Sequence, residues 1–166
     1  ICNHTALDRQ GKHIADQIVG AGGVELVAFF GPEHGIRGEV DASVGDSVDA
    51  RTNRKVYSLY NLQLPREQRY RPTSEQLAGI DTLVFDIQDV GARFYTYSCT
   101  LLYALEEAAK SGREFYVLDR PNPITGVHME GPILDKALES FVGCFEMPVR
   151  HGMTFGEMAR MMTGQR

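Results

Sequence analysis

Three clusters of polar residues follow apolar stretches of the sequence, at residues 31–35, 86–93 and 119–123. They contain Glu33 and His34, then Asp86, Gln88, Asp89 and Arg93, then Asp119, Arg120 and Asn122. In open parallel sheets, ligands bind beyond the carboxyl ends of the strands, near the point where the strand order reverses. We therefore expect the three clusters to meet in one acidic crevice suited to general acid–base chemistry.

Glu33 is the candidate general acid. It follows Phe29 and Phe30, and a carboxyl group beside aromatic rings loses hydration, which raises its pKa. The alternative is a solvated glutamate in a turn bounded by glycine and proline. His34 is expected to orient a ligand or bind its hydroxyl groups, with a structural role as the alternative.

The second cluster offers carboxylates and a guanidinium group. Asp86 lies where the apolar stretch ends, so capping of a neighbouring helix is its alternative role. Gln88 and Asp89 are expected to face solvent or a sugar. Arg93 either grips a substrate carboxylate bidentately or forms a structural salt bridge with one of the aspartates.

Two tyrosines and the third cluster complete the candidate site. Tyr95 and Tyr97 have flat faces of the kind on which sugar rings stack, and the alternative is that they belong to the core. Asp119, Arg120 and Asn122 carry hydrogen-bonding groups in a loop that two prolines make rigid. Such a loop suits binding, although prolines also serve as plain turn formers.

The elements that must position these clusters alternate between strand and helix. Apolar runs predict strands at 24–30, 55–60, 82–87 and 114–118, and short hairpin strands are expected within 127–150. Helices are predicted at 12–21 and 97–111. Two further helices are predicted to begin at capping boxes, one at Thr73–Gln76 and one at Thr154–Glu157. Loops are expected at 35–54 and 61–72. The methionines of the last helix are expected in the core. This alternation favours an α/β domain with a mostly parallel sheet.

Length and composition exclude several classes of protein. The 166 residues suit one domain, and 43% hydrophobic residues allow a substantial core. A net charge of −5 without a basic cluster argues against nucleic-acid binding. The three cysteines are too far apart for a zinc motif and are expected to be buried and free. No apolar run approaches the roughly 20 residues that span a bilayer.

Motifs for other chemistries are missing. The sequence has no G-x-G-x-x-G after a strand, no P-loop, no H-E-x-x-H and no G-x-S-x-G. We therefore expect no cofactor and no bound metal, although acidic residues and histidines are abundant near the crevice. No signal peptide is visible, and the sequence opens at Ile1 and stops after a helix-like segment, so we expect a domain truncated at both ends.

A series of motifs resembles the NamZ-like exo-β-N-acetylmuramidase family of bacterial peptidoglycan glycosidases. In order they are FFGPEHGIRGEVDA, VYSLY, FDIQDVGARFYTY, VLDRPNPITG, EGPILD, FVG and VRHGMTFGE, and they run through nearly the whole chain. The resemblance implies a Rossmann-like open, mostly parallel sheet with helices on both faces. It implies that residues 1–166 are the catalytic domain and that the family's C-terminal auxiliary domain is absent from this chain. Near the start, Asn3 matches the family whereas Cys2 and His4 depart from it.

The resemblance also implies an activity, the release of N-acetylmuramic acid from the non-reducing ends of peptidoglycan fragments, and an extracytoplasmic location. The resemblance implies that Glu33, in the P-E-H-G motif, is the general acid. The second carboxylate is expected to be Asp89, then Asp86, then Glu130, unless the acetamido oxygen of the substrate is the nucleophile. The expected substrate-binding residues are Asn3, His34, Arg37, Asp86, Gln88, Arg93, Tyr95, Arg120, Asn122, Glu130 and His151, with Arg93 or Arg120 on the lactyl carboxylate.

Two other functions stay open at this point. The crevice suits a module that binds a muropeptide without cleaving it, and calorimetric binding without product would indicate that function. It also suits a metal-dependent hydrolase of another substrate, for which loss of activity on chelation would be diagnostic.

Overall fold

The computed structural model describes residues 1–38 and 45–164. Its strands form two small sheets and a hairpin. In the first sheet β1 (Ala28–Gly31) pairs in parallel with β3 (Lys55–Ser58), and β2 (Ser47–Val48) pairs antiparallel with β3. In the second sheet β4 (Thr82–Phe85) pairs in parallel with β5 (Glu114–Val117).

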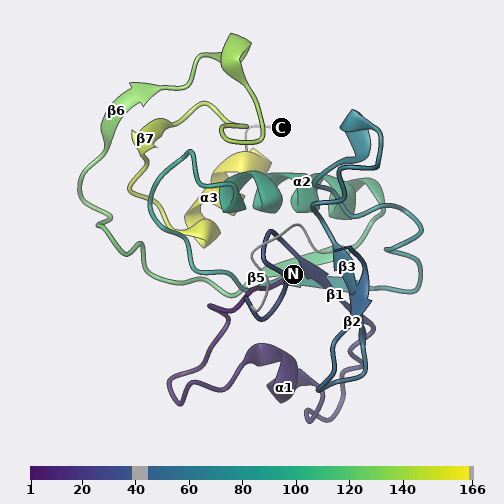
Figure 1. The fold of residues 1–166 in the computed structure, drawn as a ribbon. Coiled ribbons are helices and arrows are strands. Elements are labelled where there is room, and N and C mark those ends of the chain that lie inside the picture. Colours follow the sequence, from purple (N-terminus) through teal and green to yellow (C-terminus); the bar gives the residue numbers. More distant parts are fainter. Residues whose placement is uncertain (39–44, 165–166) are drawn as a thin grey trace.

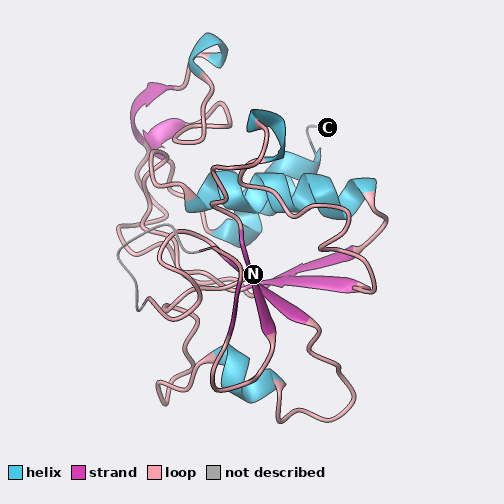
Figure 2. Cartoon of the chain, turned by 45° about the vertical axis from the view of Figure 1, so that its right-hand side comes forward, coloured by secondary structure: helices cyan, strands magenta, loops and turns pink. Residues whose placement is uncertain are grey.

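The first residues of the chain join the two sheets into one layer. The Cys2 N–H donates to the Phe30 carbonyl at 3.2 Å, and the Asp86 N–H donates to the Ile1 carbonyl at 2.9 Å. The order across the layer is therefore β2, β3, β1, residues 1–2, β4, β5 (Figure 2). The strand order reverses beside residues 1–2, and in such sheets a crevice opens at this point beyond the carboxyl ends.

Helices cover both faces of this layer. On one face lie α2 (Tyr97–Lys110) and α3 (Phe155–Gly164), and on the other lies the short α1 (Ile14–Ile18) (Figure 1). Side chains alternate across a strand, so Phe30 joins the core under α2 and α3 while Phe29 packs with Ala15 of α1. The predicted α/β class with a mostly parallel sheet is confirmed.

The longest helix forms as its sequence predicts. Leu101, Ala104 and Ala108 share one face of α2 and are at most 1% exposed, and full burial of a leucine contributes about 1.5–3 kcal/mol. The helix ends at Lys110, just before Gly112, which adopts a positive φ of 65°. The capping box at the start of α3 is also present: Thr154 N–H donates to Glu157 Oε2 at 2.9 Å.

Other predicted elements differ in length. The capping box at Thr73–Gln76 forms, with Thr73 N–H donating to Gln76 Oε1 at 2.9 Å, yet only a turn follows, because Gly79 reaches a positive φ within one helical turn. The predicted helix at 12–21 contracts to Ile14–Ile18. The predicted loop at 35–54 contains β2, and its residues 39–44 lie outside the described residues.

The remaining segments lie around this layer. The hairpin predicted within 127–150 is present as β6 (Glu130–Ile133) paired antiparallel with β7 (Pro148–Arg150), and it projects from the body of the domain (Figure 1). Two short 3₁₀ helices, η1 (Arg66–Gln68) and η2 (Lys136–Leu138), lie in loops. All three cysteines are buried and free, and Met158 and Met162 lie in the core, as predicted. Among the described residues, no helix is long and apolar enough to span a bilayer.

Candidate active site

Glu33 stands at the apex of a tight turn directly after β1. His34 and Gly35 both adopt positive φ angles, 69° and 71°, and the Gly35 N–H donates to the Pro32 carbonyl at 3.1 Å. The turn folds back so closely that a Cβ on Gly31 would lie 3.3 Å from the Gly35 Cα. Backbone strain of this kind is tolerated where a side chain must be held out for binding or chemistry.

The expected desolvation of Glu33 by its aromatic neighbours is wrong. Phe29 and Phe30 are 3% and 1% exposed because they point into the two opposite cores, whereas Glu33 is exposed. Burial is the main cause that raises the pKa of the phenols of Tyr60 and Tyr97, and the charge of Glu33 adds to it in both. Glu33 therefore lies near these two tyrosines.

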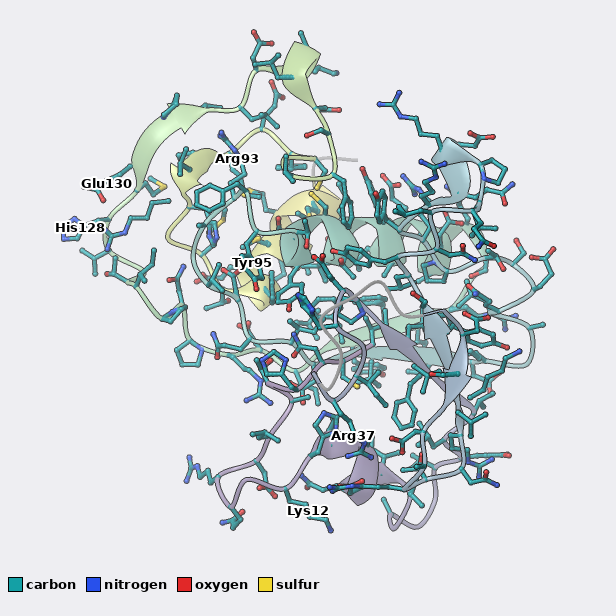
Figure 3. The ribbon with its side chains drawn as sticks, viewed as in Figure 1. Lys12, Arg37, Arg93, Tyr95, His128 and Glu130 are labelled. Carbon is teal, nitrogen blue, oxygen red and sulfur yellow. The ribbon has the colours of Figure 1, made fainter. Side chains whose placement is uncertain are left out.

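Tyr97 begins α2 and is buried beside the site. Burial, followed by the neighbouring Tyr95, raises the pKa of Tyr97 to about 12. The two rings meet edge to face with centroids 4.8 Å apart. Tyr95 remains 40% exposed, so it can present a ring face to a sugar, and Figure 3 shows it at the start of α2. Tyr97 itself belongs to the core, which is the alternative that the sequence left open for it.

Asn3 supplies a buried amide at the same place. Its Oδ1 accepts from the N–H and the hydroxyl of Thr5, at 2.9 and 2.6 Å. Its Nδ2 is buried without an aligned partner, while hydrogen bonding from the Asn3 side chain acts to lower the pKa of Tyr97. The Thr5 hydroxyl also accepts from the Gln88 N–H at 2.9 Å. Residues 3–5 and the end of β4 are thus fastened together beside Glu33.

Asp86 and Arg120 are paired with each other. Arg120 Nη2 lies 2.7 Å from Asp86 Oδ1, and its Nε donates to the same oxygen at 2.8 Å. The guanidinium also donates to the Leu7 carbonyl at 3.2 Å. The pair ties the ends of β4 and β5 to the loop after Asn3, and Asp86 does not cap a helix.

Asp89 is buried, so the expectation that it faces solvent is wrong. Its side chain is 3% exposed, and its Oδ2 accepts from the Gly91 N–H at 2.9 Å. The same oxygen lies 3.1 Å from His151 Nε2, but the two groups are not aligned as a hydrogen bond. Gln88 is half-buried and donates to the Asp89 and Pro121 carbonyls at 2.9 and 3.0 Å. Both side chains hold loops together.

The loop after β5 joins the same assembly. Asn122 Nδ2 donates to the Met153 carbonyl at 3.0 Å, and Asn122 Oδ1 accepts from the Ile124 N–H at 3.1 Å. Asp119 turns away to the start of α3, where its carboxylate accepts from the Thr154 hydroxyl at 2.7 Å. The second and third polar clusters do meet, through Asp86 with Arg120 and Gln88 with Pro121, and many of their groups bind one another.

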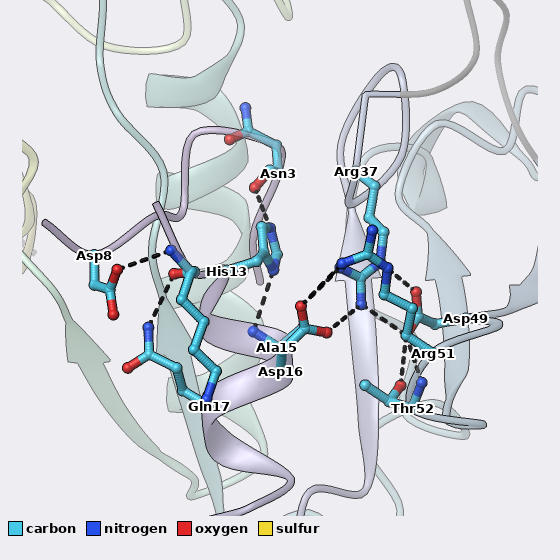
Figure 4. A network of polar contacts seen from close by, with 11 residues as sticks. Asn3, Asp8, His13, Ala15, Asp16, Gln17, Arg37, Asp49, Arg51 and Thr52 are labelled. Atoms are coloured by element: carbon cyan, nitrogen blue, oxygen red, sulfur yellow. Dashed lines mark hydrogen bonds and ion pairs between the residues drawn. The ribbon is translucent and has the colours of Figure 1, made fainter. Parts of the chain in front are cut away.

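Three predicted site residues lie further out (Figure 3). Arg93 donates to the Pro132 and Met147 carbonyls of the hairpin, so its predicted salt bridge to an aspartate is wrong. Glu130 is on β6 and pairs with Arg150, which lowers its pKa. Arg37 pairs with Asp16 of α1 and with Asp49 at 2.8 and 2.6 Å (Figure 4).

Sequence reasoning missed Tyr60 and Thr96. The Tyr60 hydroxyl donates to Thr96 Oγ1 at 2.6 Å, which links the segment after β3 to the residue preceding α2. The signal available was Tyr60 itself, the last residue of the VYSLY motif and of the predicted strand at 55–60. Its partner is 36 positions away, so no local pattern indicates the contact.

Fold and site together define an α/β domain with polar residues gathered at the carboxyl ends of its parallel strands, the place where such domains bind ligands. Residues 1–166 match the family model described as exo-beta-N-acetylmuramidase NamZ, N-terminal. The chain belongs to this family.

Individual relatives agree with the family assignment. The chain is 46% identical over 163 residues to the peptidoglycan beta-N-acetylmuramidase NamZ of Bacillus subtilis (strain 168), covering 97% of this chain and 38% of the relative. Two crystal structures of DUF1343 family proteins from Bacteroides fragilis NCTC 9343 are similar. BF0371 has a TM-score of 0.89 at 43% sequence identity, and the match covers 99% of this chain and 40% of that chain. BF0379 has a TM-score of 0.82 at 37% sequence identity, and the match covers 99% of this chain and 41% of that chain. The chain thus spans about two fifths of the length of these relatives.

Proposed function

We propose that this protein is a glycosidase that releases N-acetylmuramic acid from the non-reducing ends of peptidoglycan fragments, with Glu33 as the general acid. The observation that carries the proposal is the position of Glu33, exposed at the apex of a strained turn in a chain of this family. The name of the Bacillus subtilis relative, a peptidoglycan beta-N-acetylmuramidase, supports the substrate.

The surroundings of Glu33 support a protonation step. A general acid must reach the leaving oxygen within hydrogen-bonding distance, and the exposed carboxyl of Glu33 can approach a bound substrate. Behind it, Tyr97 has a pKa raised to about 12 by burial and by Tyr95, so its hydroxyl keeps its proton at neutral pH. Asn3 is 0% exposed and hydrogen bonding from its side chain acts on Tyr97, so we assign Asn3 to holding that phenol in place.

The state of the other carboxylates favours participation of the substrate itself. Asp86 is paired with Arg120, Asp89 is buried against His151, and Glu130 is paired with Arg150 on the hairpin. Each is occupied by a cationic or imidazole partner. We therefore propose that the acetamido oxygen attacks the anomeric carbon while Glu33 protonates the leaving oxygen, a route that needs no carboxylate nucleophile.

We also propose the remaining family attributes. The parallel order, numbering residues 1–2 as the first strand, is 3-2-1-4-5, which supports a Rossmann-like designation. The greater length of the relatives supports a two-domain protein in which residues 1–166 are the catalytic domain. An extracytoplasmic location follows from the proposed substrate, and fractionation of the producing cell tests it.

Turnover of a chromogenic N-acetylmuramide tests the central proposal. Glu33→Gln keeps the size of the side chain and removes the acid, so the rate should fall at least about a hundredfold. Glu25→Gln is the matched control, because Glu25 is also exposed but lies before β1. Near-normal turnover by Glu33→Gln would remove Glu33 from the role, and tight binding of the sugar without any product from the wild type would indicate a binding module.

A further inference from the structure

Two of the three cysteines, Cys99 and Cys144, belong to the core beneath α2 and α3. Cys99 is the third residue of α2, and Cys144 directly follows a turn in which Ser140 and Gly143 exchange backbone hydrogen bonds of 2.8 and 3.0 Å. The Cys99 thiol donates to the Ser140 carbonyl at 3.9 Å, so this turn packs against the start of the helix. The third cysteine, Cys2, lies in the opposite core with α1.

The thiols of the pair act on each other. A hydrogen bond from the Cys144 thiol lowers the pKa of Cys99, and the backbone N–H groups of Cys144 and Gly143 act in the same direction. The same contact, together with burial, raises the pKa of Cys144. Two cysteines can be bridged without backbone movement only where their side chains already point toward each other, and these two meet that condition. The lowered pKa also favours the thiolate of Cys99, which is the form that attacks a disulfide.

Cys144 gives the pair its access to solvent. It is 6% exposed and lines a cleft of about 800 Å³ over α2, whereas Cys99 is 0% exposed. A small oxidant in the cleft therefore meets Cys144 first. Cys2 is 3% exposed on the far side of the sheet, and burial raises its pKa to about 11. The chain thus carries a less reactive cysteine that serves as an internal reference.

We propose that Cys99 and Cys144 are a redox-active pair that a small disulfide compound, R–S–S–R, oxidises to a Cys99–Cys144 disulfide. The Cys144 sulfur attacks one sulfur of the compound, and its proton leaves with the first R–S group as R–SH. The Cys99 sulfur then attacks Cys144 Sγ in the mixed disulfide, and its proton leaves with the second R–SH. The two thiols lose two electrons and two protons, which reduce the compound to two thiol molecules. Oxidation of the pair does not require the proposed glycosidase activity.

The disulfide ties the turn after η2 to the start of α2. The two cysteines are 45 positions apart, so the bond closes a long loop in the unfolded chain and stabilises the folded protein. The turn carries Phe141, which stacks on Tyr70 with ring centroids 3.7 Å apart and meets Tyr60 edge to face at 5.3 Å. Oxidation therefore fixes the aromatic group that packs on Tyr60. A disulfide of this kind persists in an oxidising compartment, which agrees with the extracytoplasmic location proposed above.

Peptide mass spectrometry of the wild-type protein tests the proposal. The folded protein is incubated with oxidised glutathione, acidified to stop exchange, then unfolded with an alkylating reagent and digested. We expect two peptides joined through Cys99 and Cys144, and an alkylated Cys2. Three alkylated cysteines, a bond to Cys2, or glutathione that stays on Cys144 would each overturn the proposal.

Thermal unfolding measures the effect of the bond. The Tm of the oxidised wild type should exceed that of the reduced protein by about 5–10 °C, because the loop is long. Cys144→Ser should show no such difference, whereas the matched control Cys2→Ser should keep it. An unchanged Tm in a wild type that carries the bond would refute the tie between turn and helix. The wild-type peptides decide the proposal even where a variant does not fold.

Discussion

His151 Nε2 lies 3.1 Å from Asp89 Oδ2, and the two side chains are 0% and 3% exposed. His151 Nδ1 accepts from the Met153 N–H at 3.2 Å, which leaves Nε2 on the side of the Asp89 carboxylate, although the two groups are not aligned as a hydrogen bond. The pair joins the turn after β4 to the segment after β7. Its role is to position these loops around the crevice.

The first prediction concerns this pair. Asp89→Asn replaces with an amide the carboxylate whose Oδ2 accepts from the Gly91 N–H and lies next to His151. The free energy of unfolding should therefore fall by about 1–3 kcal/mol. Urea denaturation measures it, with Asp81→Asn, an exposed aspartate before β4, as the control. An unchanged stability together with a hundredfold loss of kcat would instead place Asp89 in the chemistry.

The second prediction concerns acid stability. Hydrogen bonds from Arg37 hold the pKa of Asp49 well below its usual range. A group with a depressed folded-state pKa stabilises the protein above its unfolded pKa, about 3.9 for aspartate, and loses this contribution as the pH falls toward the folded value. Arg37→Met should cost about 3 kcal/mol at neutral pH, because it leaves a buried charge without its cation.

Denaturation at a series of pH values checks this result. The difference between Arg37→Met and the wild type should shrink as the pH falls below about 4, because the unfolded chain then protonates this aspartate while Arg37 keeps it ionised in the folded wild type. Arg51→Met is the control, because Arg51 is 67% exposed and only approaches Asp16 at 3.3 Å. A difference that is constant with pH would contradict the assignment.

The third prediction concerns a close approach of loops. Gly91 has a φ of +84°, and a Cβ there would overlap Ile124 Cγ1 and lie 2.8 Å from Asn122 Oδ1. Gly91→Ala should therefore lower the stability by about 2–4 kcal/mol, from backbone strain and overpacking together. Gly112→Ala separates the two effects, because its φ is +65° and nothing lies within 4 Å of the added Cβ. Equal costs in the two variants would show that the contact with Asn122 and Ile124 is absent.

The fourth prediction concerns the hydroxyl of Tyr97. Tyr97→Phe keeps the buried ring and removes the group beside Asn3 and Glu33, so turnover of the chromogenic muramide should fall about tenfold, the effect of one hydrogen bond. The phenol titration near pH 12 should also disappear from the ultraviolet spectrum. Tyr116→Phe, on the exposed side of β5, is the control. Full activity in Tyr97→Phe would exclude its hydroxyl from the site.

Local patterns predict the framework well and the side-chain partners poorly. The apolar runs at β3, β4 and β5 and the 3.6-residue repeat of α2 are properties of neighbouring residues, and these elements form close to their expected bounds, whereas the strand expected at 24–30 begins only at Ala28. The convergence of the polar clusters follows from the parallel order alone. The partner of Asp89, by contrast, is 62 positions away at His151, and Arg93 binds carbonyls of a hairpin whose docking depends on the tertiary fold.

Glu33 illustrates the same limit at short range. Two phenylalanines precede it, yet alternation along β1 sends their rings to opposite faces, and the turn at Gly31–Gly35 carries the carboxyl away from both. Composition near a residue does not determine its environment when the chain reverses within four positions. The geometry of the turn has to be known first.

The central position of residues 1–2 in the layer has a consequence for how the protein acquires its structure. The amino group of Ile1 donates to the Val84 carbonyl, across 83 positions of sequence. The two halves of the sheet can therefore form separately, but they can be joined only after a very long loop has closed. Non-local pairing of this kind slows folding. We expect residues 1–2 to be among the last to find their place, with both strand edges beside them open in the meantime.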